Sequence, residues 1–152
     1  MAIDFTDPTQ INDAAIAELN EQLMQQTPRE ILKFALANFK NIAVSFSGAE
    51  DVALIELAHK LAKPLQVFSL DTGRLHPETY QFIEQLTERL KLNLQIFRAP
   101  ISPAWQEARF GRLWEKGVDG LSQYNRINKV EPMEDGLERL HVGTWFAGLM
   151  RS

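Results

Sequence analysis

Two short loops of this sequence carry residue types that suit the binding of a small anion. The first, residues 45–51, reads Ser-Phe-Ser-Gly-Ala-Glu-Asp and leads directly into a helical pattern. Small residues let the backbone approach a phosphate closely, Ser47 adds a hydroxyl donor, and a helix N-terminus adds free N–H groups and a favourable dipole. The loop lacks the Gly-Lys-Ser/Thr ending of a Walker-type loop. By spacing alone it is equally well a helix cap, with Ser47 at the N-cap and Glu50 as its capping-box partner.

The second loop, residues 71–80, reads Asp-Thr-Gly-Arg-Leu-His-Pro-Glu-Thr-Tyr and follows another apolar run. Its arginine, Arg74, could hold phosphate or sulfate through a forked contact. Asp71 is equally suited to an Asx-turn. His76 stands beside Pro77 without an evident acid–base partner, so we interpret it as an exposed turn residue.

Alternating strand and helix patterns place both loops at one edge of a sheet. Apolar runs at residues 42–46 and 65–70 predict buried strands, and the alternation over residues 92–97 predicts a third strand near an edge. Helical spacing over residues 50–61 and 77–90 predicts the connecting helices. This alternation indicates an α/β fold with a parallel sheet, and ligands of such sheets bind at the carboxyl ends of the strands.

The remaining segments are mostly helical in pattern. Helical spacing over residues 11–23 and a capping box beginning at Thr27 predict an N-terminal helical segment, residues 1–39, ahead of one compact domain, residues 40–152. The elements predicted after the third strand are a helix over residues 103–116, an irregular loop over 120–128, a helix over 131–140 and a strand over 141–149. The aromatic residues interpreted as core rather than as a ligand stack are Trp105, Phe110, Trp114 and Trp145.

Composition narrows the function classes. The chain has 152 residues, 45% of them hydrophobic, and a net charge of −4, which argues against a general nucleic-acid binder. It has neither a signal-peptide pattern nor an apolar run near the ~20 residues of a membrane span, so we expect a soluble cytoplasmic protein that contacts no membrane. Zero cysteines exclude disulfides, thiolate metal sites and a thiol nucleophile within these residues, and three scattered histidines suggest no metal site.

Several motifs, in order along the chain, resemble one enzyme family. The segment from Ser47 to Asp51 resembles the PP-loop of the adenine nucleotide alpha hydrolase-like superfamily, and residues 70–80 resemble the sulfonucleotide reductases. Residues 105–111, 124–133 and 144–149 are similar to the phosphoadenylyl-sulfate (PAPS) reductase branch. The resemblance implies a three-layer, doubly wound, mostly parallel sheet of about five strands with helices on both faces, under an N-terminal helical cap.

The activity that this resemblance implies is the reduction of 3′-phosphoadenylyl sulfate to sulfite and adenosine 3′,5′-bisphosphate in sulfate assimilation and cysteine biosynthesis. Thioredoxin or glutaredoxin would donate the electrons, and a homodimer is the implied assembly. Similar adenylyl-sulfate reductases hold a [4Fe–4S] cluster with cysteines at the positions that Tyr124 and Asn125 occupy here. Four thiolate ligands are excluded, which favours the PAPS branch without a cofactor. The Ser-Gly-Ala-Glu-Asp loop also occurs in the adenylyl-sulfate branch, so adenylyl sulfate stays open as the substrate.

In this family a cysteine near the C-terminus attacks the sulfur of the nucleotide. The chain ends at Arg151 and Ser152, inside a segment where the family continues. We therefore expect either a truncated reductase or a short natural relative, and in both cases a chain that binds nucleotide and does not reduce it. Two different functions also stay open. One is an ATP pyrophosphatase or sulfate adenylyltransferase-type enzyme, whose loop more usually reads Ser-Gly-Gly-Lys-Asp, and the second is a non-catalytic sulfonucleotide-binding module.

The resemblance also assigns binding roles, although it assigns no catalytic or metal-binding residue within the chain. The residues expected beneath the phosphosulfate are Ser45, Ser47, Gly48, Ala49 and Glu50, with Asp51 structural at the helix start. Those expected on the adenosine side are Leu70, Asp71, Thr72 and Gly73, with Arg74 facing an anionic group. The basic candidates for the sulfate or the 3′-phosphate are Arg126, Lys129 and Arg151.

Overall fold

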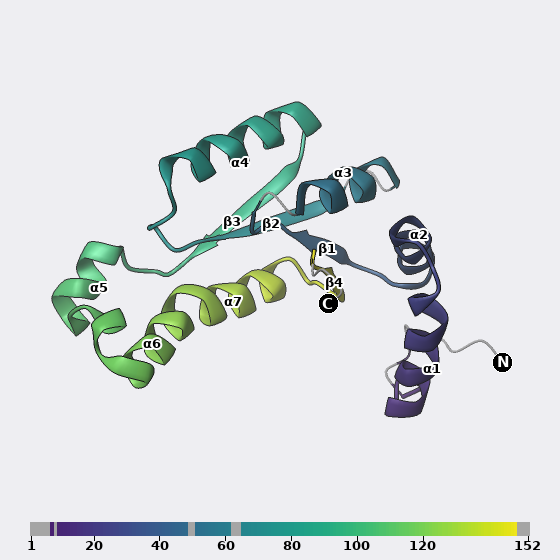
Figure 1. The fold of residues 1–152 in the computed structure, drawn as a ribbon, viewed down its shortest axis with the longest axis horizontal. Helices are drawn as coiled ribbons and strands as arrows, with labels where there is room; N and C mark the ends of the chain where they lie inside the picture. The colour runs from purple at the N-terminus through teal and green to yellow at the C-terminus, as the bar shows by residue number, and fades with distance from the viewer. Residues whose placement is uncertain (1–6, 8, 49–50, 62–64, 149–152) are drawn as a thin grey trace.

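A parallel sheet with helices on both faces forms the centre of the molecule (Figure 1). The computed structural model describes residues 7, 9–48, 51–61 and 65–148. In this part of the chain the sheet has four strands in the order β3-β2-β1-β4. Their bounds are β1 (Ile42–Ser45), β2 (Gln66–Asp71), β3 (Asn93–Arg98) and β4 (Thr144–Phe146). The α/β class and the edge position of β3 are confirmed, and the described residues hold four strands where about five were expected.

The two central strands, β1 and β2, consist mainly of apolar residues, which suits strands whose two faces are both covered by other elements. Val44 of β1 lies opposite Val67 of β2 and Phe146 of β4, and Val44 and Val67 are completely buried. Parallel strands covered on both faces need such continuous apolar runs. The edge strand β3 is more exposed and alternates in sequence, as predicted.

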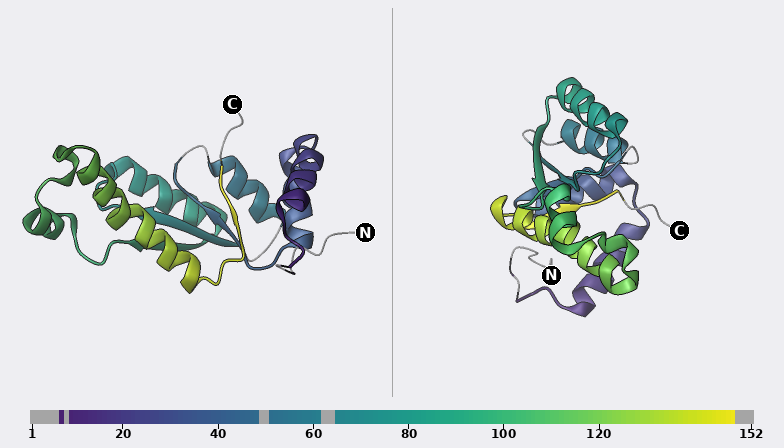
Figure 2. Two further views of the ribbon diagram at one scale, coloured as in Figure 1. Left: turned by 90° about the horizontal axis from the view of Figure 1, so that it is seen from below. Right: turned by 90° about the vertical axis from the view of Figure 1, so that its left-hand side faces the viewer.

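Crossover helices α3 (Val52–Leu61) and α4 (Pro77–Leu90) cover one face of the sheet, and α7 (Glu131–Arg139) covers the other. Figure 2 shows these three layers end-on. Helix α7 approaches β3 closely at Gly136, where an added Cβ would overlap the ring of Phe97. This packing fixes α7, and the segment before it, against the sheet.

The N-terminal helices are α1 (Asp13–Met24) and α2 (Pro28–Asn38). The capping box predicted at the start of α2 is present, since Glu30 N–H donates to the hydroxyl of Thr27 and Thr27 N–H donates to the Glu30 carboxylate at 2.8 Å. Leu32 of α2 is buried in the same apolar core as Val44. Helix α2 thus contributes to the same core as the sheet. The division into an N-terminal segment, residues 1–39, and a domain, residues 40–152, stays a prediction.

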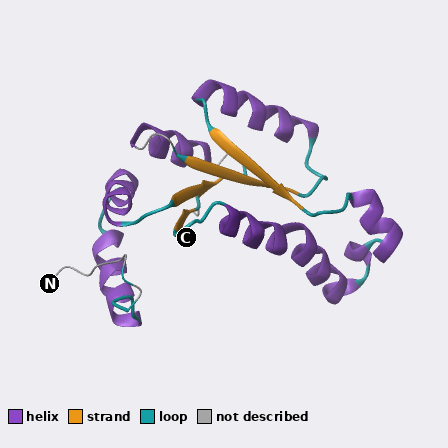
Figure 3. Cartoon of the chain, turned by 180° about the vertical axis from the view of Figure 1, so that it is seen from behind, coloured by secondary structure: helices purple, strands orange, loops and turns teal. Residues whose placement is uncertain are grey.

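The chain between β3 and β4 is more helical than predicted. Helix α5 (Pro103–Phe110) ends at Gly111, whose φ of 71° interrupts the predicted helix, and the short 3₁₀ turn η2 (Leu113–Glu115) follows. The elements that come next are α6 (Gly117–Asn125), the π-helical turn η3 (Arg126–Val130) and α7. The prediction of a loop over residues 120–128 is therefore wrong. Figure 3 shows one nearly continuous helical run from α6 to α7.

Of the four aromatic residues predicted to be core, three are exposed and Phe110 is half-buried. Trp105, Trp114 and Trp145 retain 64%, 38% and 45% of their accessible surface. Trp114 packs edge-on against Tyr124, and Trp145 packs against Phe68. Their helical or strand spacing did not predict their burial, because spacing shows which residues share one face of an element and not whether another element covers that face. Within the described ranges, no helix is long and apolar enough to cross a membrane.

Candidate functional site

A cavity of about 520 Å³ opens at the carboxyl ends of β1 and β2. The chain runs from β1 outward to β2 and β3 and then returns to β4 on the other side of β1, so strand order reverses between β1 and β4. Ligands of open α/β sheets bind at such a reversal, and the volume suits a small-molecule site. The lining residues are Ser45, Phe46, Ser47, Asp51, Phe68, Ser69, Leu70, Thr72, Leu75, Thr79, Ile83, Lys129, Met133, Trp145, Ala147 and Gly148.

Asp51 organises the loop after β1. The residue is 3% exposed, and its carboxylate accepts hydrogen bonds from Ser47 N–H at 2.6 Å, from the Ser47 hydroxyl at 2.7 Å and from Gly48 N–H at 3.3 Å. The structural role expected of Asp51 is confirmed. Glu50, the capping-box partner that spacing suggests for Ser47, lies outside the described residues, as does Ala49. Gly148, just after β4, is so close that a Cβ there would overlap the Asp51 carboxylate.

A second carboxylate, Asp71, organises the loop after β2. It accepts hydrogen bonds at 2.7 Å from Gly73 N–H, which makes the Asx-turn that its residue type suits, and from the Tyr80 hydroxyl. Arg98 Nε lies 3.9 Å from the same carboxylate. The hydrogen bond to Asp71, helped by desolvation, raises the pKa of Tyr80 above its usual value. Thr72 from this loop faces the main cavity, whereas Asp71 and Gly73 line a smaller pocket of about 230 Å³ beside it.

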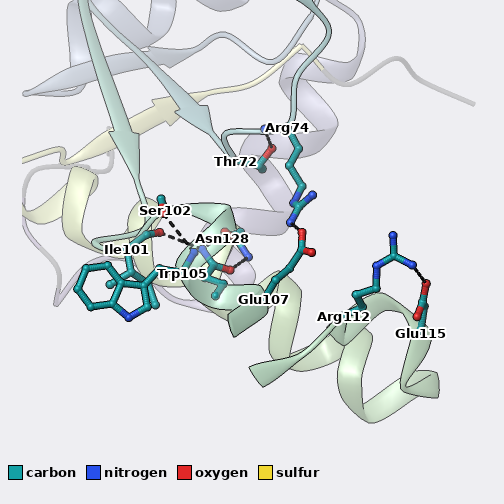
Figure 4. Close-up of polar contacts among 10 residues, drawn as sticks. Thr72, Arg74, Ile101, Ser102, Trp105, Glu107, Arg112, Glu115 and Asn128 are labelled. Carbon is teal, nitrogen blue, oxygen red and sulfur yellow. Dashed lines mark hydrogen bonds and ion pairs between the residues drawn. The ribbon is translucent and has the colours of Figure 1, made fainter. Parts of the chain in front are cut away.

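Arg74 does not line the main cavity in this structure. Its guanidinium pairs with Glu107 of α5 (Figure 4). It also lies 4.4 Å from the centre of the Trp114 ring. Arg126 likewise does not line it, since it is exposed and bonds Glu131 at 3.0 Å. Both arginines have anionic partners within the chain.

The structure brings part of the predicted set together. The predicted residues that line the main cavity are Ser45, Ser47, Leu70, Thr72 and Lys129. Gly48 adjoins a neighbouring pocket of about 280 Å³, between the first loop and α4. Arg151 lies outside the described residues.

Several lining residues were not predicted. Ser69 is 5% exposed and donates to the carbonyl of Phe46 at 2.7 Å, joining β2 to the first loop. A serine inside an apolar strand could have signalled this role. Thr79, Met133 and Ala147 belong to α4, α7 and the segment after β4, and sequence spacing does not show that these elements meet.

The cavity suits a ligand with an anionic part and an apolar part. Among its described lining residues Lys129 is the one cation, and the one acid, Asp51, is occupied by the loop N–H groups. Phe46, Leu70 and Ile83 supply an apolar wall. The described residues hold no group of three or more His, Cys, Asp or Glu side chains that could bind a metal ion.

Known proteins are similar to this chain in sequence and in fold. Residues 41–152 match the family model described as the phosphoadenosine phosphosulfate reductase domain. A phosphoadenosine 5′-phosphosulfate reductase of Shewanella oneidensis is 50% identical over 97% of this chain and 61% of its own length. A protein of the same name from Zymomonas mobilis is 48% identical over 95% of this chain and 60% of its own length. A PAPS reductase structure from Candida auris, in complex with phosphate, superposes with a TM-score of 0.81 at 25% identity, covering 93% of this chain and 70% of that one.

The chain spans about three fifths of the length of the bacterial relatives that it matches. The match nonetheless includes the sheet, both candidate loops and the segment from η3 to β4. The chain belongs to the phosphoadenosine phosphosulfate reductase domain family.

Proposed function

We propose that this chain is the nucleotide-binding part of an enzyme that reduces PAPS to sulfite and adenosine 3′,5′-bisphosphate in sulfate assimilation. One observation carries the proposal: a cavity at the strand-order reversal combines a serine- and glycine-containing loop, a lysine and an apolar wall. Relatives that are half identical bear the name of this activity.

The loop after β1 would hold the phosphosulfate. Ser47 and Gly48 supply backbone and hydroxyl donors, which Asp51 already gathers in one place. An incoming phosphate group would share or replace the Asp51 contacts. The other members of this subsite in the proposal are Ser45, Ala49 and Glu50.

Lys129 of η3 would neutralise the anionic part of the nucleotide. The adenosine would lie toward the end of β2, where Leu70 and Thr72 face the cavity and Asp71 and Gly73 shape the turn. Arg74, Arg126 and Arg151 stay in the proposal as further anion contacts. Arg74 and Arg126 would first have to leave Glu107 and Glu131.

The chemical step needs a thiolate that these 152 residues do not contain. In the proposed reaction a thiolate attacks the sulfur of PAPS, the sulfur–oxygen bond to the phosphate breaks, and adenosine 3′,5′-bisphosphate leaves. The resulting S-sulfo cysteine is then attacked by a reduced thioredoxin or glutaredoxin, which releases sulfite and ends as a disulfide. The residues present here bind and orient the nucleotide for that attack.

We also infer that the enzyme acts in the cytoplasm as a homodimer and without a resident cofactor. These three inferences rest on the resemblance to the cluster-free branch of the reductases. Adenylyl sulfate stays the second candidate substrate, because the Ser-Gly-Ala-Glu-Asp loop suits that branch as well.

Calorimetric titration with adenosine 3′,5′-bisphosphate, AMP and ATP tests the proposal without the missing thiol. Preferential binding of the bisphosphate supports a PAPS site, and equal binding of the bisphosphate and AMP favours adenylyl sulfate. Binding of ATP alone, with release of pyrophosphate, would replace the reductase by an adenylyl-transferring enzyme.

A further inference from the structure

A buried pair of amide side chains links α5 to the π-helical turn η3. Gln106 and Asn128 are 6% and 1% exposed. Gln106 Nε2 donates to Asn128 Oδ1, and Asn128 Nδ2 donates to Gln106 Oε1, both at 2.9 Å. The second hydrogens of the two amides are donated to the carbonyls of Ile101 and Tyr124, at 3.1 and 3.0 Å. All four amide hydrogens are therefore satisfied, which makes a closed and rigid polar network.

This network joins two segments that are distant in sequence and that both line the smaller pocket beside the main cavity. Ile101 follows the carboxyl end of β3, and Asn128 belongs to the turn that enters α7. Figure 4 shows Asn128 beside Ile101 and Ser102 at the start of α5. The residue after Asn128 is Lys129, the described cation that lines the main cavity. The network thus anchors the turn that presents this cation.

The Gln106–Asn128 pair matters because the chain runs away from the sheet between Ile101 and Asn128. Elements α5, η2 and α6 extend away from the sheet at one end of the molecule (Figure 1). The turn that returns from them is π-helical, with Glu131 N–H bonded to the carbonyl of Arg126. Such single π-turns are uncommon, and they frequently occur at functional sites. Pro132 lacks an N–H, so it cannot complete an ordinary α-helical turn at this place.

We propose that Gln106 and Asn128 are positioning residues, whose mutual amide hydrogen bonds fix the π-turn and thereby hold Lys129 at the nucleotide. The inference rests on the proposed function, since it assumes that Lys129 contacts the anionic part of a nucleotide. Neither amide is charged, and neither needs to touch the ligand. In this proposal their effect on binding passes through Lys129, although both amides also line the smaller pocket beside Thr72.

A double-mutant cycle tests this dependence. Adenosine 3′,5′-bisphosphate is titrated calorimetrically into the wild-type chain, Gln106→Met, Lys129→Met and the double variant. We expect Lys129→Met to weaken binding about tenfold or more and Gln106→Met about threefold to tenfold. In the Lys129→Met background, Gln106→Met should have no further effect. Gln123→Met, the same change on an exposed position of α6, should bind like wild type.

Stability and affinity separate a positioning role from a merely structural one. Gln106→Met will also lower the unfolding temperature, because it leaves the amide of Asn128 without its partner. A purely structural role predicts equal losses of affinity in the wild-type and Lys129→Met backgrounds. Additive effects of this kind, or an unchanged affinity in Gln106→Met, would overturn the inference.

A measurement without ligand keeps the test independent of the proposed function. The lysines are ¹³C-methylated and the Lys129 signal is followed by NMR in wild type, Gln106→Met and Gln123→Met. We expect the signal to shift in Gln106→Met alone, and an unmoved signal overturns the inference. If the signal shifts and no chain binds bisphosphate, the proposed function fails while the anchoring of Lys129 stands.

Discussion

The carboxylate of Asp51 accepts hydrogen bonds from the backbone N–H and the hydroxyl of Ser47, at 2.6 and 2.7 Å. This relationship shapes the loop after β1 before any ligand arrives. Burying a carboxylate costs free energy unless hydrogen-bond donors compensate its charge. In return, the Asp51 carboxylate draws the loop donors toward one point through charge-assisted hydrogen bonds. Asp51 therefore serves both the fold and the candidate site.

Asp51→Asn should destabilise the protein and weaken nucleotide binding together. All three loop donors bond one oxygen, Oδ2 of Asp51, so an amide oxygen in that place accepts them without the negative charge that strengthens such bonds. We expect a loss of about 1–3 kcal/mol in the free energy of unfolding, measured by chemical denaturation. Asp135→Asn removes an exposed carboxylate that pairs with Arg139, and it should change stability by less than about 0.5 kcal/mol. Equal effects of the two variants would show that Asp51 does not organise the loop.

Lys129→Met should weaken the binding of adenosine 3′,5′-bisphosphate about tenfold or more, with little change in unfolding temperature, because the lysine is an exposed cation at the cavity wall. The contribution is electrostatic, so the difference between variant and wild type should shrink as salt is added. Lys60→Met on α3 removes a lysine that pairs with Glu56, and it should bind normally. A wild-type affinity in Lys129→Met would remove this residue from the site.

Tyr80→Phe should reduce stability by about 1 kcal/mol at neutral pH, because it removes the hydrogen bond to Asp71. The raised pKa of Tyr80 gives the sign of the pH dependence. The protonated phenol stabilises the fold at pH values below its unfolded pKa of about 10, and this stabilisation is lost as pH rises through the higher folded value. Denaturation at pH 8 and pH 11 should show the stability difference between wild type and Tyr80→Phe closing. A gap that widens would contradict the assignment.

Gly136→Ala should destabilise the protein, although alanine is normally the better helix former by about 1 kcal/mol. The added Cβ would overlap the Phe97 ring, so α7 would have to move away from β3. Adding Phe97→Leu should recover part of the loss in thermal unfolding. If Gly136→Ala is more stable than wild type, the close approach of α7 to the sheet is wrong.

The sheet and the first loops could be predicted from sequence because local patterns determine them. Apolar runs such as that around Val44 indicate buried strands, and Thr27 with Glu30 indicates a helix start. These features involve neighbours along the chain. Their prediction therefore needed no knowledge of tertiary packing.

The region from α5 to η3 could not be predicted in the same way. Two glycines and several polar residues weaken the helical pattern of α6. The π-turn contains Asn128, whose side chain bonds Gln106, 22 residues away. The contacts of Arg74 could not be predicted either. Its residue type suggested contact with an anionic ligand, but in the fold it lies beside Glu107 and Trp114. Contacts between distant segments decided both outcomes.

A crystal structure of the chain with adenosine 3′,5′-bisphosphate tests the central claim most directly. We predict one phosphate at the Ser47–Gly48 loop, Lys129 Nζ within hydrogen-bond distance of a phosphate oxygen, and adenosine against Leu70 and Thr72. A nucleotide bound outside this cavity, such as in the smaller pocket between Asp71 and Gln106, would contradict it.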